Sequence, residues 1–184
     1  GYDMYLQLLE EAVLEERGEK KTARADCSAD LTVSANLPES YIPSGEQRMD
    51  IYRRIAAVRT REESQDLLDE LLDRYGEPPA STLALLDVAM LRSAAVSAGI
   101  RDIAQRGDTI TFTFGGEMPV EAVMRVCTMG RNKRRLTLSA GTEPRLALRL
   151  EKGEEPLKAA LELVESIAPA EDESATRLPQ GRVQ

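Results

Sequence analysis

Residues 37–54 read LPESYIPSGEQRMDIYRR, a short connector that leads into a helix. Each proline in it fixes its own φ angle and moves the preceding residue out of the α region, so Leu37 and Ile42 are expected to be extended. Tyr41 and Ile42 are large and apolar, and we expect them to anchor the connector to a core. A helix is predicted to begin near Gly45, where apolar residues start to recur at helical spacing.

The same reasoning predicts a helical first half. Three helices are predicted, over 45–58, 61–75 and 81–98. The middle one opens with a capping-box pattern, Thr60 followed by Glu63. Gly76 is expected to end it, because glycine readily adopts the left-handed conformation that follows many helices.

Beyond residue 100 the pattern changes to strands that alternate with helices. The segment TITFTF at 109–114 places Ile110, Phe112 and Phe114 on one side, as in a half-buried strand. The other predicted elements are strands over 30–35, 103–105, 136–138 and 146–150, and helices over 119–129 and 156–167. The sequence therefore predicts an α+β fold, with an N-terminal helical half followed by a small antiparallel or mixed sheet covered by helices.

Four blocks of sequence occur in an informative order. They are GYDMY at 1–5 leading to LLEEA at 8–12, the connector at 37–54, DRYG at 73–76 followed by two prolines, and LR at 91–92 leading to GI at 99–100. In this order they resemble the C-terminal domain of the bacterial transcription-repair coupling factor family, DNA translocases that work on stalled RNA polymerase. The resemblance extends from residue 1 to about residue 100.

This resemblance and the composition together predict four parts. Residues 1–17 are similar to the last helix of the preceding motor domain, and the polar, partly basic stretch 18–29 is the expected linker. Residues 30–168 are expected to form the C-terminal regulatory domain. Apolar residues nearly vanish from Pro169 onward, so 169–184 is expected to be a loose tail.

Missing residue types exclude several functions. The chain of 184 residues has no histidine, the commonest general base and a frequent metal ligand, and no Gly-x-x-x-x-Gly-Lys-Ser/Thr loop for a nucleotide. Cys27 and Cys127 are far apart and are expected to be ordinary thiols. We expect no catalytic residue, cofactor or metal. No apolar run approaches the roughly 20 residues that span a membrane, so a cytoplasmic location without membrane contact is expected.

The predicted helix over 61–75 carries an acidic stripe. At about 100° per residue, four acids fall within about 60° of arc: Glu62, Asp66, Asp69 and Asp73. The opposite face is expected to hold Leu67, Leu68, Leu71, Leu72 and Tyr75. A solvated helix face is the simple explanation. However, like charges three and four residues apart repel one another, which favours a basic partner surface and makes these acids candidate interdomain docking residues.

A basic turn follows the predicted helix over 119–129. Its cations, Arg131, Lys133, Arg134 and Arg135, are candidates for a weak phosphate contact. A solvated turn explains them as well, because cations are favourable at a helix C-terminus. The net charge of −8 also opposes binding to a polyanion.

What the resemblance implies is a non-catalytic, autoinhibitory domain. The family's motor is an ATP-dependent DNA translocase that displaces stalled RNA polymerase and recruits nucleotide excision repair. In that family the C-terminal domain docks on the N-terminal module of the same chain and masks the surface for the excision-repair damage-recognition protein. The expected direct partner is therefore that N-terminal module, with RNA polymerase, DNA and the repair protein involved indirectly.

Two other functions remain open. One is a nucleic-acid-binding accessory module that uses the basic turn at 131–135 together with Lys20 and Lys21. The other is a carboxylate-based hydrolase, since acids are plentiful although no catalytic pair can be chosen from the sequence.

Overall fold

The computed structural model of the chain describes residues 27–169. The predicted helix over 1–17, Lys20, Lys21 and all but the first residue of the predicted tail at 169–184 lie outside this part. In chain order the elements are β1 (Ser28–Asp30), α2 (Gly45–Ala56), α3 (Arg61–Tyr75), α4 (Ala80–Ser97), β2 (Ile100–Arg106), β3 (Thr109–Phe114), α5 (Val120–Thr128), the 3-10 helix η1 (Gly130–Arg134), β4 (Leu136–Ser139), β5 (Arg145–Arg149) and α6 (Pro156–Ile167).

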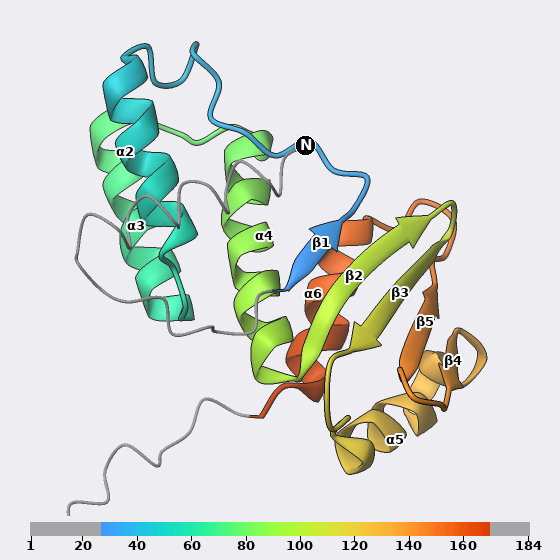
Figure 1. Cartoon of the computed structure of the whole chain (residues 1–184). Coiled ribbons are helices and arrows are strands. Elements are labelled where there is room, and N and C mark those ends of the chain that lie inside the picture. The colour runs from blue at the N-terminus through green and yellow to red at the C-terminus, as the bar shows by residue number, and fades with distance from the viewer. Residues whose placement is uncertain (1–26, 170–184) are drawn as a thin grey trace, which may run out of the picture.

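The five strands form one mixed sheet in the order β1-β2-β3-β5-β4. β1 is parallel to β2, and the other neighbours are antiparallel. Phe112 in β3 pairs with Ile103 on one side and Leu146 on the other, so one row of apolar side chains crosses the sheet. All three are buried. Together with the helices that precede the sheet, this arrangement confirms the predicted α+β fold (Figure 1).

The first strand is not where the sequence placed it. A strand was predicted over 30–35, from the alternation of Leu31 and Val33 with polar residues, but β1 is Ser28–Asp30. Its three residues pair with Asp102, Ile103 and Ala104 of β2. Val33 is 38% exposed. The strand is thus determined by its pairing partner about seventy residues away, which the local pattern does not contain.

Helix α4 is the centre of the packing. It stands between the α2–α3 pair and the sheet with α6 (Figure 1), and its buried residues lie on several of its faces. Its length and apolar composition alone would suffice for a membrane span, but half of it is buried inside this domain. That burial is typical of the core helix of a globular protein.

Both ends of α3 are set by residues beside them in the sequence. Thr60 Oγ1 accepts a hydrogen bond from the Glu63 amide, and the Glu63 carboxylate accepts one from the Thr60 amide, which completes the predicted capping box. Gly76 follows the helix with φ at 80°, a conformation that disfavours any residue with a side chain.

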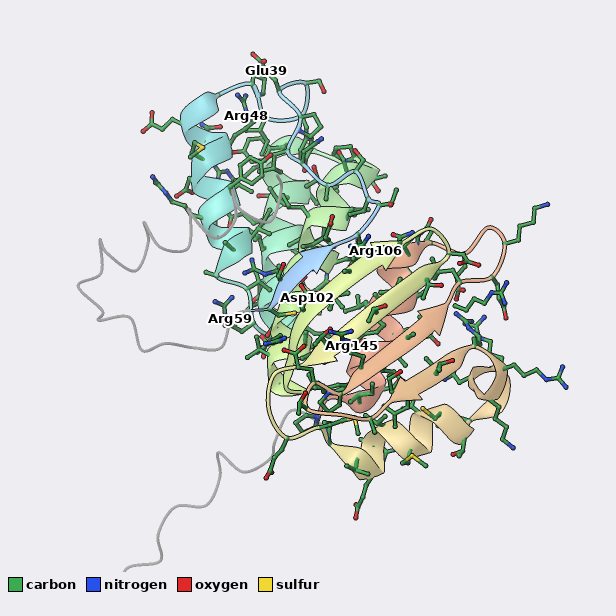
Figure 2. The ribbon with its side chains drawn as sticks, turned by 45° about the vertical axis from the view of Figure 1, so that its right-hand side comes forward. Glu39, Arg48, Arg59, Asp102, Arg106 and Arg145 are labelled. Atoms are coloured by element: carbon green, nitrogen blue, oxygen red, sulfur yellow. The ribbon has the colours of Figure 1, made fainter. Side chains whose placement is uncertain are left out.

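The connector before α2 is anchored as predicted. Ile42 is fully buried, and the single proton of the Tyr41 hydroxyl is shared between the carbonyls of Leu71 and Gly76, at 3.2 and 2.9 Å. Arg48 turns back from α2 toward the connector (Figure 2) and donates to the Ile42 carbonyl at 2.8 Å. These contacts fix the start of α2 against the end of α3.

One face of the sheet carries no helix in the described part of the chain. α6 lies behind the sheet in Figure 1, and the opposite face is turned to the viewer. Side chains on this face are small or polar, because they alternate with the apolar row; Thr113, for example, pairs with Asp102 and Arg145. Figure 2 shows Asp102 and Arg145 over this face.

Candidate functional site

The four acids of the predicted stripe all lie exposed on α3. None of Glu62, Asp66, Asp69 and Asp73 forms an ion pair with another residue in the described range 27–169. Asp69 accepts one hydrogen bond, from the side chain of Gln65 at 2.8 Å. We call these four residues the acidic stripe. The structure thus keeps them together as an unneutralised surface.

A fifth acid on the same helix behaves differently. Glu70 points toward α2 and pairs with Arg54 of that helix, at 2.5 Å, and with Arg74, at 2.9 Å. α3 therefore separates its carboxylates by direction: the one beside α2 is neutralised, and those of the acidic stripe face solvent.

Leu72 is the residue on α3 that the sequence placed wrongly. It was expected on the buried face with Leu71, but it is 49% exposed, whereas Leu71 is fully buried. At about 100° per residue, Leu72 lies roughly 60° from Asp69, at the margin of the acidic stripe. The helical pattern located the apolar side of α3 but overestimated the width of its buried part.

The basic turn is split by the structure. Arg135 is only 8% exposed and donates from Nη2 to the Glu154 carboxylate at 2.7 Å. Arg131 approaches Glu151 and Glu154, each at 3.5 Å. Lys133 and Arg134 are exposed, and neither forms an ion pair within the described residues. Two of the four predicted phosphate-contact residues are therefore engaged with acids of the domain itself.

Glu154 is the acid that holds Arg135 in place. Burial raises the pKa of its carboxyl, but hydrogen bonds from the Glu151 amide and from Arg135 outweigh that effect, so the pKa lies below its usual value. An ionised Glu154 is thus favoured beside the buried guanidinium.

A pocket lies beside this turn that the sequence did not reveal. It has a volume of about 640 Å³ and is lined by the turn and by Arg149, Leu150 and Glu151 at the end of β5. Arg149 alternates with buried leucines along a strand, and local sequence offers no signal that it meets a turn about fifteen residues earlier. Its position depends on the pairing of β4 with β5.

The described residues offer little support for a metal site or a reactive thiol. No group of three carboxylate or thiol side chains there is placed to hold a metal ion. Cys27 is buried and Cys127 partly buried, and burial raises the pKa of the Cys127 thiol, so its reactive thiolate form is disfavoured.

Known proteins match this chain at the level of family and fold. The model of the TRCF domain family matches residues 31–124, just over half of the chain. The transcription-repair-coupling factor of Bacillus subtilis (strain 168) is 35% identical over 122 residues, or 66% of this chain and 10% of the relative. That of Staphylococcus epidermidis is 38% identical over 112 residues, or 60% of this chain and 10% of the relative.

A solved structure agrees with the fold. The crystal structure of a C-terminal domain of transcription-repair coupling factor superimposes with a TM-score of 0.68 at 20% sequence identity, covering 79% of this chain and 95% of that domain. The chain spans about a tenth of the length of the curated relatives that it matches.

Proposed function

Because the chain belongs to the TRCF domain family of the transcription-repair-coupling factors, we propose that it is the non-catalytic, autoinhibitory C-terminal domain of such a factor. In the resting parent, an ATP-dependent DNA translocase of the bacterial cytoplasm, it docks on the N-terminal module. Docking masks the surface that recruits the excision-repair damage-recognition protein. RNA polymerase and DNA act on the domain only through the rest of the parent.

The observation that carries this proposal is the unpaired state of the acidic stripe. Four exposed carboxylates at helical spacing repel one another, and no described cation relieves them. The same helix neutralises Glu70, the acid that faces α2, with two arginines. A stripe left unpaired on such a helix supports a basic partner surface outside the described residues.

Leu72 adds an apolar contact to this surface. Docking sites commonly combine a few apolar anchors with a polar, solvent-accessible rim. An exposed leucine at the margin of the acidic stripe fits that arrangement. It also accounts for Leu72 without placing it in the core of the domain.

Weak contacts suffice for such docking. Each ion pair at a rim contributes only about 0.2–1 kcal/mol. Covalent attachment, however, gives the domain an effective concentration of order millimolar near its partner module. Four pairs and an apolar anchor can therefore favour the docked state of the parent over the undocked state by a factor of roughly ten to a hundred.

Deletion of the domain tests the proposal in the full-length parent. The cut is best made before Cys27, because that residue is buried in the domain. The truncated parent is expected to hydrolyse ATP or translocate faster without RNA polymerase, and to bind the damage-recognition protein more tightly. Equal behaviour of the intact and truncated parents in both assays would show that the domain is not autoinhibitory.

Charge reversal tests the surface itself. The pair Asp66→Lys and Asp69→Lys in the full-length parent should reproduce the deletion, since both side chains are exposed and the buried Leu67 and Leu71 are untouched. The matched control reverses Glu117 and Glu121, two exposed acids beside and on α5, and should leave the resting state unchanged. If the stripe variant melts normally and stays at the resting level, the stripe is only a solvated helix face.

A further inference from the structure

A basic pocket lies far from the acidic stripe. α3 and β4 are at opposite ends of the molecule in Figure 1, and the pocket adjoins β4 through the turn that precedes it. Its charged lining consists of Arg131, Lys133, Arg134, Arg135, Arg149 and Glu151. Five cations line it with one carboxylate, in a chain whose net charge is −8, while Glu154 and Asp108 pair with Arg135 and Arg149 from outside the lining. The local charge attracts anions although the whole domain repels them.

Arg135 carries unused hydrogen-bond donors at this pocket. The residue is 8% exposed, and its Nε and Nη1 atoms are closed off from solvent without a hydrogen-bond partner in the described part of the chain. Nη2 alone is well bonded, to Glu154. Buried polar groups are nearly always bonded, because a hydrogen bond left unmade in the interior is costly. Nη1 faces Glu151, which lines the pocket, so it is the donor that an acceptor in the pocket can reach once Glu151 moves.

The Glu151 carboxylate makes only weak contacts with Arg135 and Arg131. Its carboxylate lies 3.8 Å from Arg135 Nη1, too far for a hydrogen bond, and 3.5 Å from Arg131 Nη1, at the limit of one. Its side chain is 56% exposed. A side chain with such weak contacts and open access to solvent can rotate away at little cost. Its departure would leave the Nη1 side of Arg135 open to the pocket.

We propose that this pocket binds a phosphate oxyanion, which displaces the Glu151 carboxylate and accepts hydrogen bonds from Arg135 and Arg131. Guanidinium groups present paired donors that match phosphate oxygens, and bonds of this charged kind are the stronger ones in proteins. Lys133 and Arg134 add positive charge at the exposed mouth. The buried Glu154 stays in place, because it is the partner that keeps Arg135 oriented.

Titration of the labelled chain with inorganic phosphate tests the site. Amide chemical shifts are followed by NMR while chloride is exchanged for phosphate at constant ionic strength. Shifts are expected at the amides of η1 and of residues 149–151, and saturation gives the dissociation constant. The double variant Lys133→Gln and Arg134→Gln should weaken binding by about threefold to tenfold, from two charge contacts. Unchanged affinity in this variant would overturn the proposal.

A second variant is expected to move affinity in the opposite direction. Glu151→Gln removes the competing carboxylate and its repulsion of the ligand, so phosphate should bind about threefold to tenfold more tightly. Arg125→Gln, which removes an exposed cation on α5 outside the pocket, is the control and should leave affinity unchanged. Weaker or equal binding by Glu151→Gln would show that the pocket is not a phosphate site. Amide shifts of similar size near every exposed cation of the chain would show the same.

The source of the phosphate is distinguished by a second titrant. The second titrant is a short oligothymidylate. A nucleic-acid backbone is identified if it shifts the same amides at a lower phosphate concentration, and if the variants at Lys133, Arg134 and Glu151 change its affinity as they change that of phosphate. Binding of inorganic phosphate without the oligonucleotide identifies a free phosphorylated compound. Neither result affects the proposed docking, because the acidic stripe lies on a different part of the molecule.

Discussion

Arg54 of α2 and Glu70 of α3 form a two-bond ion pair that joins the two helices. Nη1 of Arg54 donates to one carboxylate oxygen at 2.7 Å, and Nη2 donates to the other at 2.5 Å. Arg74 donates to the same carboxylate from within α3, at 2.9 Å. The hydrogen bonds from Arg54 and then Arg74 lower the pKa of Glu70 from 4.5 to about 2. This pair joins α3 to α2 beside the acidic stripe.

Replacing Glu70 tests this link. Glu70→Gln removes the charge while keeping the side-chain shape, and it should lower the free energy of unfolding at neutral pH by about 0.2–1 kcal/mol, because the groups are partly exposed. The folded-state pKa lies below the unfolded one, so the contribution is present above 4.5 and is lost as the pH falls toward 2. Urea unfolding at a series of pH values should show a flatter acid dependence for the variant. Asp66→Asn, at an unpaired acid of the same helix, is the control and should change stability by less than about 0.5 kcal/mol.

The capping box of α3 should contribute measurably to stability. Thr60→Ala removes the hydroxyl that accepts from the Glu63 amide, and this loss is expected to cost about 1 kcal/mol. Thr60→Ser keeps the hydroxyl and should retain most of that free energy. Thermal or urea unfolding of the two variants measures the difference. Equal losses in both would mean that the methyl group of Thr60, and not the cap, is responsible.

Adjacent leucines on α3 should have opposite roles. Leu71→Ala creates a cavity at a fully buried position and is expected to cost about 2–5 kcal/mol of unfolding free energy. Leu72→Ala is at a half-exposed position, so its effect on stability should stay within about 0.5 kcal/mol. In the full-length parent, however, Leu72→Ala should raise the resting ATPase rate. If the Leu72 variant loses as much unfolding free energy as the Leu71 variant, Leu72 is a core residue and not a docking residue.

The chain by itself should neither bind nor hydrolyse ATP. Its sequence has no phosphate-binding loop and no histidine, and no described cluster could hold a metal ion. The measurement is phosphate release by the purified chain against a buffer control. Turnover that rises in proportion to the chain's concentration, and that persists through successive purification steps, would contradict a non-catalytic role.

Helix ends were predictable because their causes are local. Thr60 and Glu63 are three residues apart and satisfy each other's backbone amides, and Gly76 meets its own conformational requirement. The same holds for Ile110, Phe112 and Phe114, whose alternation marks β3 without reference to any partner. In each case the residues that determine the element lie inside it or next to it.

The candidate sites were predictable only in part. The acidic stripe followed from helical spacing, but spacing did not reveal that Leu72 is exposed beside it, since the width of a buried face depends on the neighbouring helices. The basic turn was visible as a cluster of cations. The burial of Arg135 was not, because it depends on Glu154, nineteen residues further along the chain.

By itself the sequence determined the α+β class, the family and, within one or two residues, the limits of the described helices, because these depend on periodicity, caps and short ordered blocks. The tertiary structure alone decided where β1 lies, which acids of α3 are neutralised and which cations of the turn are unpaired within residues 27–169. Each of these depends on two groups that are distant in the chain and meet in space. A three-residue strand or an ion pair is stabilised by contacts between residues distant in the chain, so no local sequence pattern can predict it.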